Sequence, residues 1–288
     1  MTVSASGIAA GHAVRWRLTG ASAAYCTATV WDAKRTAAST VCWATFDEAG
    51  PYDLRGTVRV VDARGDTVAA PTTASRTVSA TEQTDAAKVS AAELDAIRRC
   101  HNRTANVQLT FDDYGNTDQI RSIVATLNRY GARGRFFFTG QWARENPTLM
   151  RHIQRNGHLV ANHTSTHANL ADSTDARVLR EIDNGVRSTT RQPLLRPPYG
   201  AGVSTKRLNR LAARSGHELC GWTVDTRDWQ APSVAQMVTR VRRGDATTPR
   251  VEAGGVVLMH AHAKPTAAAL PAVIAAIRAR GLRVDPKP

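Results

Sequence analysis

The chain has 288 residues, 42% of them hydrophobic and 22% charged, which suits one large globular domain with a smaller one. No apolar run approaches the ~18 residues of a membrane span, so we expect none. The net charge of +14 favours an anionic partner such as a nucleic acid, an anionic membrane or an acidic cell-wall polymer. An arginine-rich, lysine-poor composition is equally typical of a GC-rich genome.

The amino-terminal part contains short strand-like runs separated by turn signals, and no helical period is sustained in it. The runs cover residues 12–18, 24–31, 39–46, 52–61 and 67–70. They predict a small β-sandwich-like accessory domain over residues 1–80, weakly similar to an immunoglobulin- or PKD-type module. The alternative is an irregular extension that packs on the next domain. Polar, alanine-rich residues 81–99 predict a linker that leads into a short helix.

From residue 100 onward, apolar runs alternate with helical stretches, which is typical of βα units. We expect strands at 106–111, 135–138, 158–161, 194–196, 218–224, 255–259 and 282–284. We expect helices at 118–130, 147–156, 174–189, 204–215, 233–243 and 266–280. The predicted fold class is therefore α/β, a distorted (β/α)7 barrel over residues 100–288, closed or nearly closed.

Polar residues stand where two of these strands end. The apolar run 107–111 stops at Asp112 and Asp113, whose side chains point in different directions because side chains alternate along extended backbone. His163 and His167 are four residues apart, so one turn of helix would place both imidazoles on the same side. Two imidazoles and one carboxylate leave open positions on a divalent metal, as catalytic sites do. Each pattern taken alone is more often a solvated turn or a surface helix.

Three later motifs complete a family pattern. They are Arg196-Pro-Pro-Tyr-Gly200, Asp225-Thr-Arg-Asp-Trp229 and Leu258-Met-His260. With the aspartate pair and the histidine pair, in this order, they resemble the NodB-type polysaccharide deacetylases, carbohydrate esterase family 4, over roughly residues 100–285. The resemblance implies a metal-dependent hydrolase that removes acetyl groups from a polysaccharide outside the cell.

The resemblance also implies a role for each motif residue. Asp113, His163 and His167 would hold the metal, which is usually zinc, with cobalt or another divalent ion possible. Asp112 would be the base that deprotonates water, and Arg196 would keep its carboxylate ionised and in place.

The remaining motif residues would serve the acid step and the substrate. Asp228 would hold His260, which stays protonated as the general acid. The backbone N–H of Tyr199 would face the oxyanion, Trp229 would wall the pocket, and Leu258 would line the space for an acetyl methyl group.

The sequence departs from the family pattern in two places. Tyr114-Gly115-Asn116 stands where the family commonly continues Gly-Pro, and since this loop borders the sugar groove, substrate preference cannot be carried over. His262 stands where a small or acidic residue is common, and we assign it no role. Asp225, which precedes the Asp228-Trp229 pair, is interpreted as structural.

The four cysteines lack the paired spacing of a zinc knuckle, and their number is even. A disulfide between Cys26 and Cys42 is plausible, because each lies in a strand-like run. Cys100 and Cys220 could pair at strand starts, away from the site. Buried free thiols are the alternative for both pairs.

The expected substrate is an N-acetyl amino-sugar polymer, with peptidoglycan ahead of chitin-type chains and acetylated xylan third. We expect a monomer that is secreted or bound to the cell wall, its signal peptide absent from this sequence. Three alternatives are an acetylxylan esterase, an inactive carbohydrate binder of the same fold, and a phosphate-ester hydrolase, which the single metal triad disfavours. Nucleic-acid binding is disfavoured because the basic residues are spread along the chain without interleaved aromatic residues.

Overall fold

The computed structural model describes residues 87–187 and 193–286 in full and, before residue 87, the backbone of seven strands. The chain divides into two compact units. One consists of Met1–Ala87 with Ala213–His217, and the other of Lys88–Ala212 with Glu218–Pro288.

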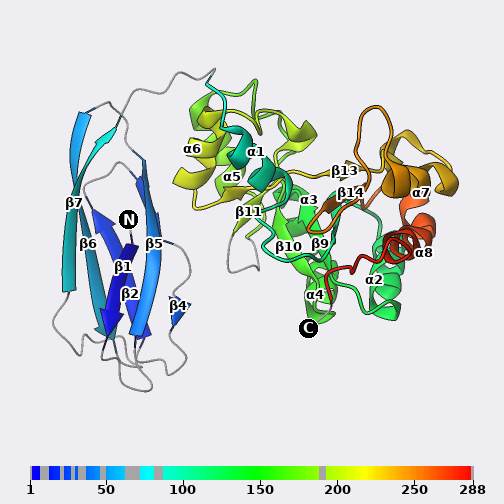
Figure 1. Ribbon diagram of the computed structural model, residues 1–288, viewed down its shortest axis with the longest axis horizontal. Coiled ribbons are helices and arrows are strands. Elements are labelled where there is room, and N and C mark those ends of the chain that lie inside the picture. Colours follow the sequence, from blue (N-terminus) through cyan, green and yellow to red (C-terminus); the bar gives the residue numbers. More distant parts are fainter. Residues whose placement is uncertain are drawn as a thin grey trace. The chain divides into compact units, whose positions relative to one another are not determined.

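The strands of the first unit form two antiparallel sheets. They are β1 (Thr2–Ser6), β2 (Ala13–Thr19), β3 (Ala23–Cys26), β4 (Val30–Trp31), β5 (Ala37–Thr45), β6 (Gly50–Val61) and β7 (Thr72–Ala80). One sheet has the order β1-β5-β3, with β4 also paired to β5, and the other has the order β2-β6-β7 (Figure 1). The predicted two-sheet, β-rich character of this region is therefore present, while the strand predicted at 67–70 lies outside the described residues.

Cys26 of β3 lies opposite Cys42 of β5 in the antiparallel register. Their side chains lie outside the described part of the chain, so the disulfide expected between them stays a prediction. The immunoglobulin- or PKD-type resemblance likewise stays a prediction.

The second unit contains a curled sheet of seven parallel strands in the order β12-β11-β10-β9-β8-β14-β13. The strands are β8 (Gln108–Asp113), β9 (Gly134–Phe138), β10 (Leu159–Asn162), β11 (Leu194–Leu195), β12 (Glu218–Leu219), β13 (Val224–Asp225) and β14 (Val256–His260). β8 lies between β9 and β14, which places Asp112 beside Phe137 on one side and His260 on the other. The predicted distorted (β/α)7 fold is confirmed.

Helices connect these strands in the order that the hydrophobic periodicity predicts. They are α1 (Ala91–Arg98), α2 (Thr117–Arg129), α3 (Gly140–Glu145), α4 (Pro147–Arg155), α5 (Asp175–Asp183), α6 (Lys206–Arg214), α7 (Val234–Arg243) and α8 (Lys264–Arg278). Figure 1 shows α2, α7 and α8 grouped together. The predicted apolar face of α2 is fully buried, because its isoleucine, valine and leucine side chains recur every three or four residues. The short helix α3 was missed by the periodicity, since it spans only six residues.

Two predicted strands differ in the structure. Residues 218–224 do not form one strand: β12 and β13 lie on opposite edges of the sheet, and residues 220–223 cross between them. The crossing makes backbone hydrogen bonds to several segments, since Gly221 N donates to Ile97 O and Thr223 N donates to Val256 O. The predicted last strand is reduced to one bridge between Val107 and Val284. Because consecutive strands form the two edges, the crossing spans the open side of the curled sheet.

The helix predicted at 174–189 ends early, at Asp183. Asn184 caps it, and Gly185 follows where a Cβ atom would lie 2.1 Å from the side chain of Asn162. A side chain at position 185 therefore cannot fit beside β10. The last part of the predicted helix, residues 188–189, lies outside the described residues.

Candidate active site

The carboxyl end of β8 presents the two aspartates to different partners. The Asp112 carboxylate faces Arg196, whereas the Asp113 carboxylate faces His163 and His167. Asp113 has a left-handed backbone conformation, with φ of 77°, and its carbonyl accepts a hydrogen bond from Thr139 N. The predicted divergence of the two side chains is what the structure shows.

Asp113, His163 and His167 form a cluster that could hold a metal ion. Oδ1 of Asp113 lies 3.0 Å from Nε2 of His163 and 3.0 Å from Nε2 of His167. One ligand atom from each residue lies within 4.8 Å of the others. Nδ1 of His163 donates to the carbonyl of Arg196 at 2.7 Å, so Nε2 is the ring nitrogen that faces Asp113 and would bind a metal. Two imidazoles and a carboxylate are a donor set that suits zinc or another divalent transition metal, so these residues fit the group.

The carboxyl group of Asp113 is held in its ionised form, which is the form that ligates a metal. Burial opposes ionisation of Asp113, but the hydrogen bonds from His163 and His167 outweigh it and hold the pKa of that carboxyl well below its usual range. Nδ1 of His167 lies 3.1 Å from the hydroxyl of Tyr199. Each imidazole is therefore oriented through the nitrogen that points away from Asp113, as metal-binding histidines usually are.

The helical turn predicted for the histidine pair is wrong. Residues 163–167 form a loop, and Thr164 and His167 have left-handed φ values of 66° and 65°. Oδ1 of Asn162 accepts from Thr164 N at 2.8 Å, and the carboxylate of Glu181 accepts from the backbone N–H groups of residues 165 and 166. Side chains thus supply the hydrogen bonds that a helix would have supplied, and they bring the imidazoles together by another route.

Glu181 is a supporting residue that sequence reasoning missed. It is buried, and it lies on α5 between the buried Val178 and Ile182. A carboxylate on the apolar face of an amphipathic helix was the available signal, since a buried charge needs partners. Here its partners are the two backbone N–H groups and the hydroxyl of Thr166.

The second pair of the site is Asp112 with Arg196. Nη1 of Arg196 donates to Oδ1 of Asp112 at 2.7 Å and to Oγ1 of Thr110 at 2.8 Å. The arginine side chain is 0% exposed, and its guanidinium lies 4.1 Å over the ring of Phe137. The other carboxylate oxygen, Oδ2, lies 4.0 Å from Nε2 of His163. Asp112 is thus held between the guanidinium and the edge of the candidate metal cluster.

The third pair is His260 with Asp228. Nδ1 of His260 donates to Oδ1 of Asp228 at 2.7 Å, and the backbone N–H of His260 donates to Oδ2 at 2.6 Å. The hydroxyl of Thr266, on α8, also donates to Oδ2. Burial lowers the pKa of His260, but the hydrogen bond and charge of Asp228 more than compensate and raise it to about 9. The imidazole is therefore protonated at neutral pH.

The residues predicted to contact the substrate are two exposed aromatic rings and one buried aliphatic side chain. Tyr199 is 70% exposed and Trp229 is 56% exposed, while Leu258 is buried in β14. Tyr199 has a φ of 61° and packs edge to face on His167, with ring centroids 4.7 Å apart. Trp229 follows directly after Asp228, and its backbone N–H donates to that carboxylate. The structure thus places the Tyr199 ring against His167 and the backbone of Trp229 against Asp228.

The residues that depart from the family pattern meet at the same place. Tyr114 stacks on His262 with ring centroids 4.8 Å apart, and Nδ1 of His262 lies 3.3 Å from Oδ2 of Asp113. Burial lowers the pKa of His262. Gly115 leaves no room for a side chain, since a Cβ there would lie 2.9 Å from the carbonyl of Ala261, and the side chain of Asn116 caps α2.

Asp225 points into its own turn. Its Oδ1 accepts from the backbone N–H of Arg227 at 2.8 Å, and its own N–H donates to the hydroxyl of Thr248. Arg227 is left-handed, with φ of 52°, so the turn redirects the chain before Asp228. These contacts agree with a structural role.

The Cys100–Cys220 disulfide is present, but the expectation that it lies away from the site is wrong. Sγ of Cys220 lies 3.3 Å from Nη2 of Arg196, the arginine that holds Asp112. The reason is the crossing described above: Cys220 belongs to residues 220–223, which pass over the open side of the sheet.

Among the described residues, no helix has the length and apolar character that crossing a membrane would need.

Comparisons with known proteins point to one family. Residues 101–220 match the family described as polysaccharide deacetylase. A chitooligosaccharide deacetylase of Bradyrhizobium sp. (strain ANU 289) is 31% identical over 218 residues, which cover 68% of this chain and 96% of that protein. A peptidoglycan-N-acetylglucosamine deacetylase of Bacillus cereus is 28% identical over 190 residues, covering 63% and 86%.

Among solved structures, the family 4 carbohydrate esterase from Streptomyces lividans in complex with acetate is similar to this chain. The TM-score is 0.54 and the sequence identity 31%, over 62% of this chain and 91% of that one.

Proposed function

The chain belongs to the polysaccharide deacetylase family, and from this premise we propose that it is an active, metal-dependent enzyme that deacetylates an extracellular polysaccharide. One observation carries the proposal: a candidate metal cluster, a buried base and a protonated imidazole all lie at the carboxyl ends of β8, β10 and β14 or just beyond. Metal-assisted hydrolysis of an amide or ester uses these three functions together.

Asp113, His163 and His167 would hold the divalent ion, with zinc as the proposed metal and cobalt as the substitute that the same donor set accepts. When bound, such an ion lowers the pKa of a coordinated water and polarises a carbonyl oxygen.

Asp112 is proposed as the general base. Its carboxylate is buried, and the Arg196 guanidinium compensates its charge through a 2.7 Å hydrogen bond. Oδ1 is engaged with the guanidinium, which leaves Oδ2, the oxygen nearer the metal cluster, to accept a proton from the attacking water.

His260 is proposed as the general acid. Asp228 holds the Nδ1 proton, so the transferable proton is on Nε2. With a pKa raised to about 9, the imidazolium is formed at neutral pH and gives that proton to the leaving amine or alkoxide as the tetrahedral intermediate collapses. The backbone N–H of His260 fixes the Asp228 carboxylate through Oδ2, and the bond from Nδ1 to Oδ1 then keeps the ring in one orientation.

The remaining predicted residues would bind the substrate. The loop that carries Tyr199 is stiffened by Pro197 and Pro198, which suits a backbone N–H that must face an oxyanion. Trp229 would stack on the polymer, and Leu258 would contact the acetyl methyl group.

The proposed substrate is an N-acetyl amino-sugar polymer, with peptidoglycan ahead of chitin-type chains. The two relatives named above act, by their names, on chitooligosaccharide and on peptidoglycan N-acetylglucosamine. The net charge of +14 favours an anionic wall over neutral chitin or xylan. We further propose a monomeric, secreted or wall-associated protein, for which the disulfide is typical, with residues 1–80 as an accessory domain and 81–99 as a linker.

Acetate release from a polymer panel tests the proposal. The full chain would be stripped with a chelator, reloaded with zinc or cobalt, and assayed on peptidoglycan, chitin oligosaccharides and acetylated xylan. We expect activity to vanish without metal, to return with it, and to be highest on the amino-sugar polymers. Preference for xylan would support an acetylxylan esterase instead, and binding of polymer without acetate release would support the inactive binder.

A further inference from the structure

Arg196 makes polar contacts through both Nη1 and Nη2, and only the partners of Nη1 include a residue of the proposed catalytic machinery. Nη1 faces Asp112 and Thr110. Nη2 donates to the carbonyl of Gly221 at 2.7 Å and lies 3.3 Å from Sγ of Cys220 and 3.6 Å from Sγ of Cys100. All polar contacts of Nη2 are therefore made with the disulfide and the residue beside it.

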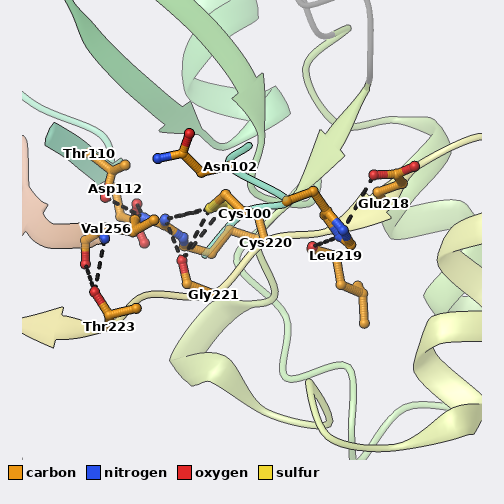
Figure 2. Close-up of a disulfide and its surroundings, with 12 residues drawn as sticks. Cys100, Asn102, Thr110, Asp112, Glu218, Leu219, Cys220, Gly221, Thr223 and Val256 are labelled. Carbon is orange, nitrogen blue, oxygen red and sulfur yellow. Dashed lines mark hydrogen bonds and ion pairs between the residues drawn. A yellow bond between two sulfur atoms is a disulfide. The ribbon is translucent and has the colours of Figure 1, made fainter. Parts of the chain in front are cut away.

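The disulfide joins two segments that are 120 residues apart in the sequence. Cys100 follows α1 and leads toward β8, and it has a left-handed φ of 49° that turns the chain inward. Cys220 and Gly221 belong to the crossing between β12 and β13. Figure 2 shows Cys100, Cys220 and Gly221 close to Asp112 and Thr110. The disulfide adds a covalent tie to the backbone hydrogen bond from Gly221 N to Ile97 O, and both hold the crossing against the end of α1.

Burial makes the position of these acceptors important. Arg196, Cys100 and Cys220 are all buried, so bulk solvent does not reach Nη2 to replace a lost partner. A buried guanidinium that loses acceptors on one side reorients toward others or pulls them with it. Because the guanidinium is planar and rigid, any rotation that serves Nη2 also moves Nη1 away from the carboxylate of Asp112.

We propose that the Cys100–Cys220 disulfide is a positioning element for the deacetylation reaction. It fixes the Gly221 carbonyl and both sulfur atoms against Nη2 of Arg196, and so holds Nη1 in the orientation that the carboxylate of Asp112 requires. The inference rests on the proposed role of Asp112 as base. The disulfide itself touches no reacting atom, and its contribution passes through the arginine.

The test is the double variant Cys100→Ala/Cys220→Ala of the full chain. We expect kcat to fall about 10- to 100-fold, because small displacements of a catalytic group have effects of that order. KM and the bound metal should stay within about twofold of the wild type, since neither the sugar groove nor the metal cluster is changed. The matched control, Cys26→Ala/Cys42→Ala, removes the other two cysteines and should leave kcat unchanged.

Removing the disulfide would lower the melting temperature whether the disulfide positions Arg196 or only stabilises the fold. The melting temperature therefore does not separate the two roles, and a second readout is needed. In an Arg196→Lys background, removing the disulfide should have little further effect on kcat, because residues that act through one another are not additive. If the losses instead multiply, or if the double alanine variant keeps the kcat of the wild type, the proposal is overturned. If the double alanine variant does not fold, Cys100→Ser/Cys220→Ser removes the disulfide bond while keeping polar acceptors beside the guanidinium.

A measurement without turnover separates this inference from the proposed function. Side-chain 15N NMR of the wild type should show distinct, slowly exchanging Nη1 and Nη2 signals for Arg196, assigned by their loss in Arg196→Lys. In the double alanine variant these signals should merge as the guanidinium rotates. Unmerged signals would overturn the positioning role, even if no polymer were deacetylated. An active wild type with unchanged kcat in the variant would overturn the positioning role alone.

Discussion

The buried and the exposed halves of the site are built differently. Asp112, Arg196 and Asp228 are almost completely buried, and each makes two or more hydrogen bonds or close polar contacts. Tyr114, Tyr199 and Trp229 are each half exposed or more, and with Val234 they are the exposed large hydrophobic residues of the described chain. Groups that transfer protons need fixed positions, whereas rings that contact a polymer must stay accessible. The variants and conditions below act on one half and leave the other intact.

The largest effect is expected at the metal cluster, which belongs to the buried half. His163→Ala removes one of the three proposed ligands and the hydrogen bond to the carbonyl of Arg196. We expect both bound metal and activity to be lost, measured by elemental analysis and acetate release. His152→Ala, on α4, is the control. Full metal stoichiometry in His163→Ala would remove the ligand assignment.

Asp112→Asn should keep the metal and lose most turnover. The amide is isosteric but does not accept a proton, and a general base typically contributes about 10² to 10⁴ in rate. Bound metal and kcat should be measured on the same preparation. Asp118→Asn, an exposed residue of α2, is the matched control. Turnover near that of the wild type would show that Asp112 is not the base.

The next effect is a shift in pH dependence. Asp228, with smaller contributions from the charges of Asp112 and Asp113, raises the pKa of His260 from 6.5 to about 9, so the acid form is available below that pH and is lost as pH rises through it. Asp228→Asn removes the charge but leaves the burial, which lowers the pKa. The alkaline limb of kcat/KM should therefore move to lower pH, together with a lower maximum. An alkaline limb at the same pH in both proteins would assign it to another group.

The His260–Asp228 pair should also make the free energy of unfolding depend on pH. A folded-state pKa above the ordinary value of 6.5 means that the stabilising contribution of His260 is complete below pH 6.5 and disappears as pH rises through about 9. Unfolding by urea across this range would show the loss in the wild type and its absence in Asp228→Asn.

Much of this site was predictable because it depends on strand ends. Apolar runs that stop at Asp112 or His260 place those residues at one edge of a parallel sheet, whatever the rest of the chain does. The five motifs then assign roles by resemblance.

The predictions that failed depend on side-chain contacts and on the curl of the sheet, which residue spacing does not encode. The loop at His163 is shaped by Asn162 and by Glu181, and the split of residues 218–224 follows from the curl of the whole sheet. Spacing four residues apart fits a helix and a loop equally well, and a short apolar run does not tell which edge it joins. The location of the disulfide beside Arg196 follows from that same split.

A smaller effect is expected in the exposed half. Trp229→Ala removes a ring that is 56% exposed while the Asp228–His260 pair remains. KM for a polymer should rise about three- to tenfold, the range of one aromatic contact, with kcat little changed. Val234→Ala, on α7 and 37% exposed, is the control. A fall in kcat without a change in KM would place Trp229 with the buried machinery instead.

The smallest effect separates the halves by salt. Exposed charges that draw the +14 chain to an anionic wall are screened over about 8 Å at physiological ionic strength, whereas buried pairs such as Asp112–Arg196 are screened much less. Activity on cell-wall material should therefore fall several-fold as salt rises, measured as acetate release at low substrate. Activity on a small neutral acetylated sugar should hardly change, because that substrate uses only the buried half. An equal response on both substrates would mean that salt acts on the chemistry itself, and the excess positive charge would then give no reason to rank peptidoglycan above chitin.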